Sequence, residues 1–125
     1  MSINDLSYKV RGAMFEVYKT LGPGLLESIY ESALVHELEL LGLKVKKQVP
    51  LPVKYKNIEL DIKFRIDIIV EDQIVLEIKS VEELNGVHYK QLLSYLKLTG
   101  HKLGLLVNFN SDNVNTSIHR VVNKI

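Results

Sequence analysis

The chain has 125 residues, of which 46% are hydrophobic and 25% charged, and its formal net charge is +1. These values predict one ordinary globular domain (residues 1–125) with a sizeable core, and no strong attraction of the whole chain to nucleic acid or membranes. The absence of cysteine excludes disulfides, thiolate metal sites and cysteine nucleophiles. No apolar run approaches the roughly 20 residues of a membrane helix, and the N-terminus lacks a signal-peptide core, so we expect a cytoplasmic protein.

The first predicted element is an amphipathic helix over 3–21, where apolar residues recur at helical spacing. Asn4 or Asp5 is its expected cap, because short polar side chains satisfy the free amides at a helix start. Gly22-Pro23-Gly24 then ends the helix, since proline cannot continue it and glycine frees the turn.

A second helix is predicted from about 25 to 41, with Gly42 as its terminator. Its apolar stripe consists of Tyr30, Leu34, Leu38 and Leu41. Glu27 lies on the side of this stripe, three residues before Tyr30, so we expect its carboxylate to face inward. The alternative is an ordinary first-turn acid, which the helix dipole favours.

From residue 43 the period changes and predicts strands. Residues 43–53 alternate apolar side chains with mostly polar or proline positions. Pro50 and Pro52 indicate an edge strand or a bulge, because proline cannot donate to a strand ladder. A turn at Lys56-Asn57 is expected to lead into a short strand over 58–62.

Residues 64–80, FRIDIIVEDQIVLEIKS, are typical of two short strands joined by a polar turn at Glu71-Asp72-Gln73. Asp67 lies in the first strand, and Glu77 and Lys79 lie in the second. Side chains alternate faces along a strand, so Glu77 and Lys79 point the same way. If the two strands pair as a hairpin, Asp67 is brought beside the other acid and the lysine.

The rest of the chain adds a helix and at least one strand. Residues 84–99 form an apolar pattern of helical type that Gly100 closes, with Leu92, Leu93, Leu96 and Leu98 on its apolar faces. The run 103–109 is almost continuously apolar, as in a strand buried on both faces. Residues 114–125 fit a short helix or a strand equally well. The strand, helix and strand of 74–109 predict a right-handed crossover, hence a mixed sheet flanked by helices in an α/β or α+β domain.

The acids and the lysine of the hairpin have a structural and a functional interpretation. They can pair with one another on a solvent-facing strand surface or as a hidden salt bridge. Apolar neighbours surround Glu77, however, and a charge in a covered strand is costly unless it is paired or bound to a metal. Two carboxylates with hard oxygen ligands suit Mg²⁺ or Mn²⁺, and a lysine beside the ion can orient water or offset transition-state charge. This chemistry is phosphodiester hydrolysis.

At these residues the chain resembles the PD-(D/E)XK nuclease superfamily. Asp67 followed by Glu77-Ile78-Lys79 matches its D…(D/E)xK signature, with Ile66 in place of the proline that precedes the aspartate. The segment 24–30, GLLESIY, resembles the motif of the GxxExxY protein family, and 91–95, QLLSY, resembles the QxxxY motif of RecB-like nucleases. The run 104–109 is similar to a later strand. The resemblance implies a restriction-endonuclease-like fold.

The resemblance also implies roles for the matching residues. Asp67 and Glu77 would hold Mg²⁺ or Mn²⁺, with the Ile78 carbonyl as a further ligand. Lys79 would activate water or stabilise charge. Glu27 would reach the same ion from the second helix.

A second group of residues is expected to contact the substrate. Gln91 and Tyr95 share a helix face, where the amide could bind phosphate or sugar and the tyrosine could steady Lys79; a surface glutamine and a core-edge tyrosine are equally consistent with the pattern. Arg65 could contact phosphate, or pair with Glu71 or Asp61. Tyr30 is expected to pack structurally beneath the site.

These features lead to one principal hypothesis and two rivals. The principal hypothesis is a Mg²⁺- or Mn²⁺-dependent nuclease acting on nucleic acid, DNA more than RNA. The rivals are a catalytically inactive module of the same fold that binds nucleic acid or a protein, and a structural subunit with an internal salt bridge. The basic residues of 44–65 could follow a phosphate backbone, or keep a strand edge soluble.

The resemblance further implies a homodimer. Its expected interface is an exposed strand edge or the aromatic side of the first helix, which carries Tyr8, Phe15 and Tyr18.

Overall fold

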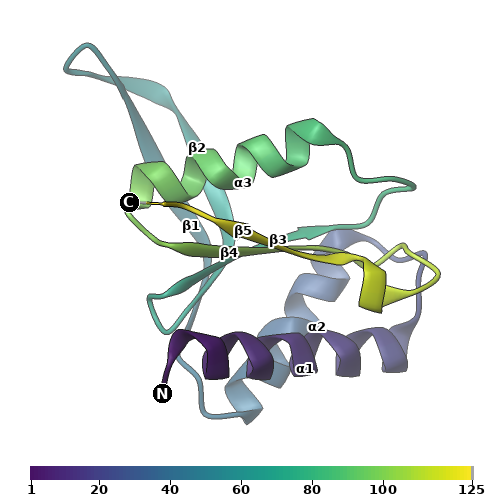
Figure 1. Ribbon diagram of the computed structural model, residues 1–125. Helices are drawn as coiled ribbons and strands as arrows, with labels where there is room; N and C mark the ends of the chain where they lie inside the picture. The colour runs from purple at the N-terminus through teal and green to yellow at the C-terminus, as the bar shows by residue number, and fades with distance from the viewer. Residues whose placement is uncertain (125) are drawn as a thin grey trace.

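The computed structural model describes residues 1–124 and has one mixed β-sheet between two layers of helices (Figure 1). The elements follow one another along the chain as α1 (Ile3–Leu21), α2 (Glu27–Leu40), β1 (Val45–Tyr55), β2 (Ile58–Val70), β3 (Ile74–Lys79), α3 (Gly86–Thr99), β4 (Leu103–Asn108), a 3-10 turn (Val114–Thr116) and β5 (Ile118–Val122). The strands lie in the order β1-β2-β3-β4-β5, and only β3 and β4 are parallel. In Figure 1, α1 and α2 lie below the sheet and α3 lies above it. The predicted mixed sheet with flanking helices is therefore confirmed, and α3 connects the two parallel strands as expected.

The first two helices differ from the prediction mainly at their ends. The cap of α1 is Ser2, whose Oγ accepts a hydrogen bond from the Asp5 amide at 3.1 Å, so neither Asn4 nor Asp5 is the cap. The capping residue has to lie before the first helical amides, and the helix already begins at residue 3. α2 ends at Leu40, and the side chain of Leu41 is exposed instead of joining the core stripe.

α3 begins two residues later than predicted because a polar pair caps it. The Asn85 side chain accepts a hydrogen bond from the Val87 amide, and His88 Nδ1 accepts one from the Asn85 amide. Gly100 ends the helix with φ of +78°, a value that glycine adopts without strain. Leu98, predicted as apolar face, is exposed. Within residues 1–124, none of the helices combines the length and the hydropathy that a membrane span requires.

β2 is one continuous strand, so the predicted break between 62 and 64 is wrong. Cross-strand pairs continue through this region, with Leu51 opposite Phe64 and Pro52 opposite Lys63. The region contains no glycine, proline or asparagine that would turn the chain. The apolar side chains of 58–62 and 64–70 therefore belong to the same strand.

The turns and the edge strand follow the sequence closely. Lys56-Asn57 and Glu71-Asp72 both form tight turns with positive φ at each residue. β1 is the edge strand that its prolines predicted, and its register shifts between Pro52 and Lys54. The tail, for which helix and strand were both open, forms the 3-10 turn and then β5; Ile125 lies outside the described residues.

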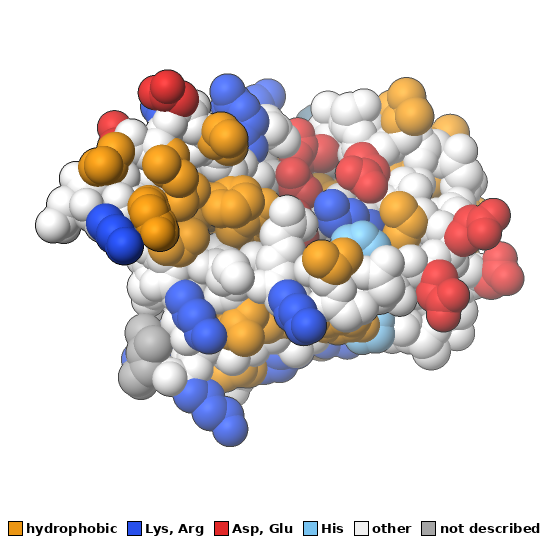
Figure 2. All heavy atoms as spheres, turned by 90° about the horizontal axis from the view of Figure 1, so that it is seen from above, with side chains coloured by type: hydrophobic (Ala, Val, Ile, Leu, Met, Phe, Trp, Pro, Cys, Tyr) orange, Lys and Arg blue, Asp and Glu red, His pale blue; other side chains and the backbone are white. Residues whose placement is uncertain are grey.

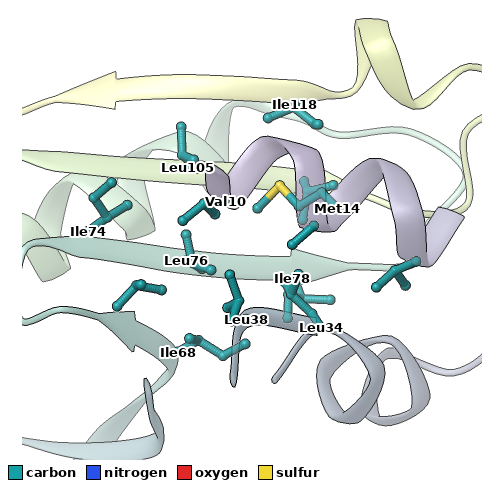
Figure 3. Packing of buried hydrophobic residues seen from close by; sticks show 14 of the residues in the cluster. Val10, Met14, Leu34, Leu38, Ile68, Ile74, Leu76, Ile78, Leu105 and Ile118 are labelled. Atoms are coloured by element: carbon teal, nitrogen blue, oxygen red, sulfur yellow. The ribbon is translucent and has the colours of Figure 1, made fainter. Parts of the chain in front are cut away.

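Two apolar layers hold the helices to the sheet. Figure 3 shows side chains of α1, α2 and several strands pointing into the lower layer. The members labelled there are Val10, Met14, Leu34, Leu38, Ile68, Ile74, Leu76, Ile78, Leu105 and Ile118. The upper layer beneath α3 contains Ile66, Ile69, Val75, Leu92, Tyr95, Leu96 and Leu106. β4 contributes to both layers and is buried along its whole length, as predicted for a strand covered on both faces.

The side chains of β1 and β2 change the face of the sheet to which they point at the position where Gln48 lies opposite Asp67. The register passes this point without an inserted residue, yet Ile68 packs in the lower layer and Ile66 in the upper one. Regular alternation would place these two isoleucines on the same face. Beyond this point the two strands continue as an arm (residues 51–64), which projects from the sheet in Figure 1.

Close packing of α3 on the sheet gives a first testable prediction. A Cβ atom at Gly104 of β4 would lie 2.9 Å from Leu92 Cδ1 and 3.0 Å from Leu92 Cγ, and Leu92 is fully buried. We expect Gly104→Ala to lower the free energy of unfolding by about 1–3 kcal/mol, because the leucine must leave its packing position. Urea denaturation measures this change.

Gly12→Ala is the matched control for this substitution. Gly12 lies inside α1, where nothing within 4 Å would meet a new Cβ atom. Alanine there should raise the free energy of unfolding by about 0.5–1 kcal/mol, since it favours the helix. Equal effects of the two substitutions would contradict the packing argument.

Candidate active site

β2 and β3 separate at the two acids that the sequence singled out. Their last ladder pair is Ile68 with Leu76. At the next position the Ile78 amide donates a hydrogen bond to Asp67 Oδ2 at 2.9 Å, and the Asp67 amide donates a long one to Glu77 Oε1 at 3.5 Å. Each carboxylate therefore accepts from the backbone of the opposite strand, in place of a ladder carbonyl.

The two acids are difficult to ionise together. Burial, and to a smaller extent the neighbouring charge of Asp67, together raise the pKa of Glu77 to about 8. Burial also raises the pKa of Asp67 to about 6, although the hydrogen bond from the Ile78 amide opposes the rise. Glu77 is only 4% exposed, so little water reaches its charge. Both carboxyl groups ionise together more easily when a cation is bound between them than when they are alone.

Lys79 is the cation whose charge acts on both acids of this pair. It is the last residue of β3, two positions after Glu77, and its side chain is half-buried. Its charge lowers the pKa of both Asp67 and Glu77. The Phe109 amide donates to the Lys79 carbonyl at 2.9 Å, which fixes the backbone of the lysine at the end of the parallel pair.

Glu27 lies beside the site at the solvent-exposed start of α2. It is the first residue of α2 and is exposed, so the expectation that it faces inward beside core leucines is wrong. The helix start projects past the apolar stripe, and its free amides favour an acid there. Glu27 Oε2 accepts a hydrogen bond from the Ser80 amide at 3.1 Å, and the Ser80 hydroxyl donates to the Leu25 carbonyl. These two bonds hold the start of α2 against the end of β3.

Tyr30 fixes the turn that precedes Glu27. Its hydroxyl donates to the Gly22 carbonyl at 2.5 Å and accepts from the Leu25 amide at 3.1 Å. Its ring is buried and stacks on Phe109 with 4.6 Å between the ring centroids. Within the turn, Gly24 has φ of +100°, which other residues rarely adopt. The spacing of Gly24, Glu27 and Tyr30 thus has a structural reason.

This double contact predicts that Tyr30→Phe destabilises the fold by about 1–3 kcal/mol, because a part-buried carbonyl and a part-buried amide lose their partner. Thermal unfolding followed by circular dichroism measures the loss. Tyr8→Phe is the matched control, since Tyr8 is 81% exposed and should leave the melting temperature unchanged. An unaltered melting temperature in Tyr30→Phe would show that the turn does not depend on the hydroxyl.

Tyr95 lies on the other side of the acid pair. It is a buried residue of α3, and its ring centroid lies 5.3 Å from that of Phe64. Burial raises the pKa of its hydroxyl to about 12, and the charges of Glu77 and Asp67 add to the rise. Gln91, one helical turn earlier, is half-buried, and no described residue forms a side-chain hydrogen bond with it.

Arg65 is exposed at the base of the arm, opposite Pro50. The alternative to a phosphate contact, an ion pair with Glu71 or Asp61, does not form within residues 1–124. The carboxylate of Glu71 instead accepts a hydrogen bond from the Lys44 amide. The guanidinium therefore remains available to a ligand.

The family model of the PD-(D/E)XK nuclease superfamily matches residues 4–121. The chain belongs to this superfamily. Its mixed five-stranded sheet with flanking helices is consistent with the restriction-endonuclease-like fold. No curated protein and no solved structure gave a significant match.

In this PD-(D/E)XK chain, Glu31 and Gln48 also line the site, although the sequence had not indicated them. Gln48 Nε2 donates to Glu31 Oε1 at 2.7 Å, and Gln48 has φ of +49°. A hollow of about 280 Å³ is lined by Glu27, Ser28, Glu31, Gln48, Asp67 and Ile78. Glu31 follows Glu27 by one helical turn, a spacing that could have indicated a shared face. Gln48 gave no such signal, because only the pairing of β1 with β2 brings it opposite Asp67.

The oxygen atoms around Asp67 suit a hard divalent cation. No described residue donates a hydrogen bond to Asp67 Oδ1 or Glu77 Oε2. The Ile78 carbonyl points to the same side as its amide, toward Asp67, because both backbone groups of a strand residue face the same neighbouring strand. In residues 1–124, however, no three acidic or histidine side chains converge as a ready metal site. The donor types of the PD-(D/E)XK superfamily are thus present, and Glu27 lines the same hollow as Asp67 while one of its oxygens accepts from the Ser80 amide.

Proposed function

We propose that the protein is a Mg²⁺- or Mn²⁺-dependent nuclease that hydrolyses phosphodiester bonds, with DNA as the first substrate to test. The observation that carries the proposal is the Asp67–Glu77 pair at the end of the β2–β3 ladder, where burial and mutual repulsion disfavour two charges. A hard divalent ion removes this repulsion and binds substrate phosphate oxygens. Membership of the PD-(D/E)XK nuclease superfamily supports the same reaction class.

Asp67, Glu77 and the Ile78 carbonyl would hold the ion, and Glu27 would bind it through its free carboxylate oxygen or through water. When bound, the ion would polarise the phosphate and lower the pKa of an attacking water. Lys79 holds a positive charge beside these acids, where it orients water and offsets the negative charge that develops on the phosphate.

The remaining residues of the site contact substrate. Gln91 binds a phosphate or sugar oxygen from the face of α3, and Tyr95, one turn further along the same helix, steadies Lys79. Arg65 contacts a phosphate next to the scissile bond. Neutral and cationic donors of this kind position a nucleic-acid backbone without reading its sequence.

The distribution of charge favours a polyanionic substrate near the site. Residues 44–65 contain seven lysines and arginines and two acids, a net charge of +5, so the rest of the chain carries −4 to give the total of +1. This segment contains all of β1, with Gln48, and residues 58–65 of β2, which end two residues before Asp67. Binding of nucleic acid is therefore expected to weaken as salt concentration rises.

The proposal is tested by removing the metal. Purified protein should cleave a panel of single-stranded and double-stranded DNA and RNA with Mg²⁺ or Mn²⁺, stop in excess EDTA, and recover when metal is restored. Asp67→Asn should lose both cleavage and the heat of Mn²⁺ binding in titration calorimetry, because the amide removes the charge that attracts the ion.

The same measurements separate the rival functions. Salt-dependent nucleic-acid binding without cleavage, unchanged in Asp67→Ala, would identify a catalytically inactive binding module. Absence of any Mn²⁺ binding would leave the acids and Lys79 with a structural role alone, although the salt bridge expected for that role does not form between them within residues 1–124. Either result would contradict the proposed nuclease activity.

A further inference from the structure

One face of the arm (residues 51–64) is apolar and uncovered. Ile58, Leu60, Ile62 and Phe64 alternate along β2 with charged residues, and the pairing of Tyr55 with Ile58 continues the apolar face onto β1. These five side chains are 37–76% exposed. Figure 2, seen from the side of α3, shows hydrophobic side chains gathered at the upper left, over the arm.

Nothing within the described chain completes this part of the sheet. β3 pairs only with residues 68–70 of β2, so both edges of the arm are without a further strand. The contact of Phe64 with Tyr95 is the point at which α3 stops covering this face. A two-stranded ribbon is only marginally stable in water without a third strand or a packed layer. An apolar face of this kind indicates an interaction surface.

The opposite face of the arm has the polar composition of a solvated surface. It carries Lys54, Glu59, Asp61 and Lys63, and Lys54 lies opposite Glu59 across the two strands. Nucleic acid would contact these cations or those nearer the acids, since the apolar side chains cannot meet a phosphate and Lys56 lies beside this face only at Tyr55, next to the turn. The occupant of the apolar face is therefore a protein surface.

We propose that this occupant is the same face of a second copy of the chain. The five exposed side chains present roughly 500 Å² of apolar surface, so two copies packed face to face bury on the order of 1,000 Å², the size at which specific association begins. The five side chains of this face are uncharged, and the Lys56 ammonium lies 5.4 Å from the centroid of the Tyr55 ring, beside the turn at the tip of the arm. A twofold arrangement therefore buries the apolar side chains against one another and leaves this ammonium at the rim. The interface borders the acid pair through Phe64 and Tyr95, but its formation does not depend on the proposed nuclease activity.

The absence of cysteine allows a direct test by cross-linking. Single-cysteine variants Leu60→Cys and Ile62→Cys on the apolar face should form a covalent dimer with a short bismaleimide reagent. Asp61→Cys and Lys63→Cys, which alternate with them on the charged face, are the matched controls and should not. Equal cross-linking on both faces, or none on the apolar face, would overturn the proposal.

Sedimentation velocity provides the second test. Wild-type protein should sediment as a dimer, and Ile62→Glu should weaken association at least about 100-fold, because it places an unpaired charge at the centre of the apolar contact. Ile62 is 76% exposed, so its replacement leaves the monomer fold intact, which circular dichroism verifies. Tyr8→Glu, on α1 and 81% exposed, is the control and should remain dimeric. A monomeric wild type, or a dimer lost in Tyr8→Glu and kept in Ile62→Glu, would refute the arm as the interface.

Discussion

Glu77→Gln is expected to abolish metal-dependent cleavage and, at the same time, to stabilise the metal-free fold. The loss of activity should be at least about 10³-fold, because the amide cannot supply the negative charge that holds the ion. The gain in stability follows from the raised pKa of Glu77, which burial and Asp67 shift from 4.5 to about 8. Above pH 4.5 the unfolded chain ionises this carboxyl freely, whereas the folded chain resists ionisation until about pH 8.

The sign of the pH dependence follows from proton binding. Between pH 4.5 and about 8 the folded wild type holds more protons than the unfolded chain, so its free energy of unfolding falls as pH rises. Asp67 adds to this fall between its ordinary value of 3.8 and about 6. At pH 8 we expect Glu77→Gln to exceed the metal-free wild type by about 2–4 kcal/mol in urea denaturation, and to show a flatter pH profile.

Metal should reverse this difference. Mn²⁺ is expected to raise the melting temperature of the wild type and to leave that of Glu77→Gln unchanged, since ligands stabilise only a fold that binds them. Glu39→Gln is the matched control, because Glu39 is exposed on α2 away from the site and should behave as wild type. A variant that is less stable than the wild type at pH 8 would show that Glu77 is a structural acid with a satisfied charge.

Lys79→Ala is expected to lower the cleavage rate about 10²- to 10³-fold while Mn²⁺ still binds. The lysine supplies charge stabilisation and not a metal ligand, so its loss should appear in single-turnover rates and not in the heat of metal binding. Its charge lowers the pKa of Asp67 and Glu77, so the variant should also need a higher pH to bind the ion.

Lys79→Arg separates charge from geometry at this position. If positive charge alone matters, arginine restores most of the rate; if the compact ammonium must orient water, it does not. Lys9→Ala, on the exposed side of α1, is the control for general loss of positive charge. Loss of Mn²⁺ binding in Lys79→Ala would instead assign the lysine to the integrity of the acid pair.

Local patterns in the sequence predicted most of the fold. The polar turn at residues 71–73 and the strand patterns on either side of it were sufficient to bring both acids together in a hairpin, because these are local properties. The alternation of faces breaks at Asp67 itself, where Ile66 and Ile68 lie in different layers. The bounds of α1, the edge position of β1 and the buried β4 followed from prolines, glycines and apolar runs in the same way. The tail remained open because its few apolar residues fit either a helix or a strand.

Features that depend on distant partners could not be predicted in this way. Glu27 lies beside the site because of its bond to Ser80, 53 residues later, and not because it faces the core. Gln48 enters the site only because the side chains of β1 and β2 change the face to which they point opposite Asp67. The long β2 was divided in the prediction because residues 58–62 look like a complete short strand when their partners on β1 are unknown.

The hydrogen bonds of Ser80 with Glu27 and Leu25 also limit the stage of protein synthesis at which the site can assemble. Glu27 and Leu25 are made early, yet their partner Ser80 lies more than fifty residues downstream, and β3 becomes an inner strand only when β4 is added. Contacts over such sequence distances form late in folding. A ribosome-bound chain that ends before β4 therefore contains Asp67 and Glu77 but lacks the strand that pairs with β3 and fixes its position. Any hydrolytic activity should appear only after β4 has been made.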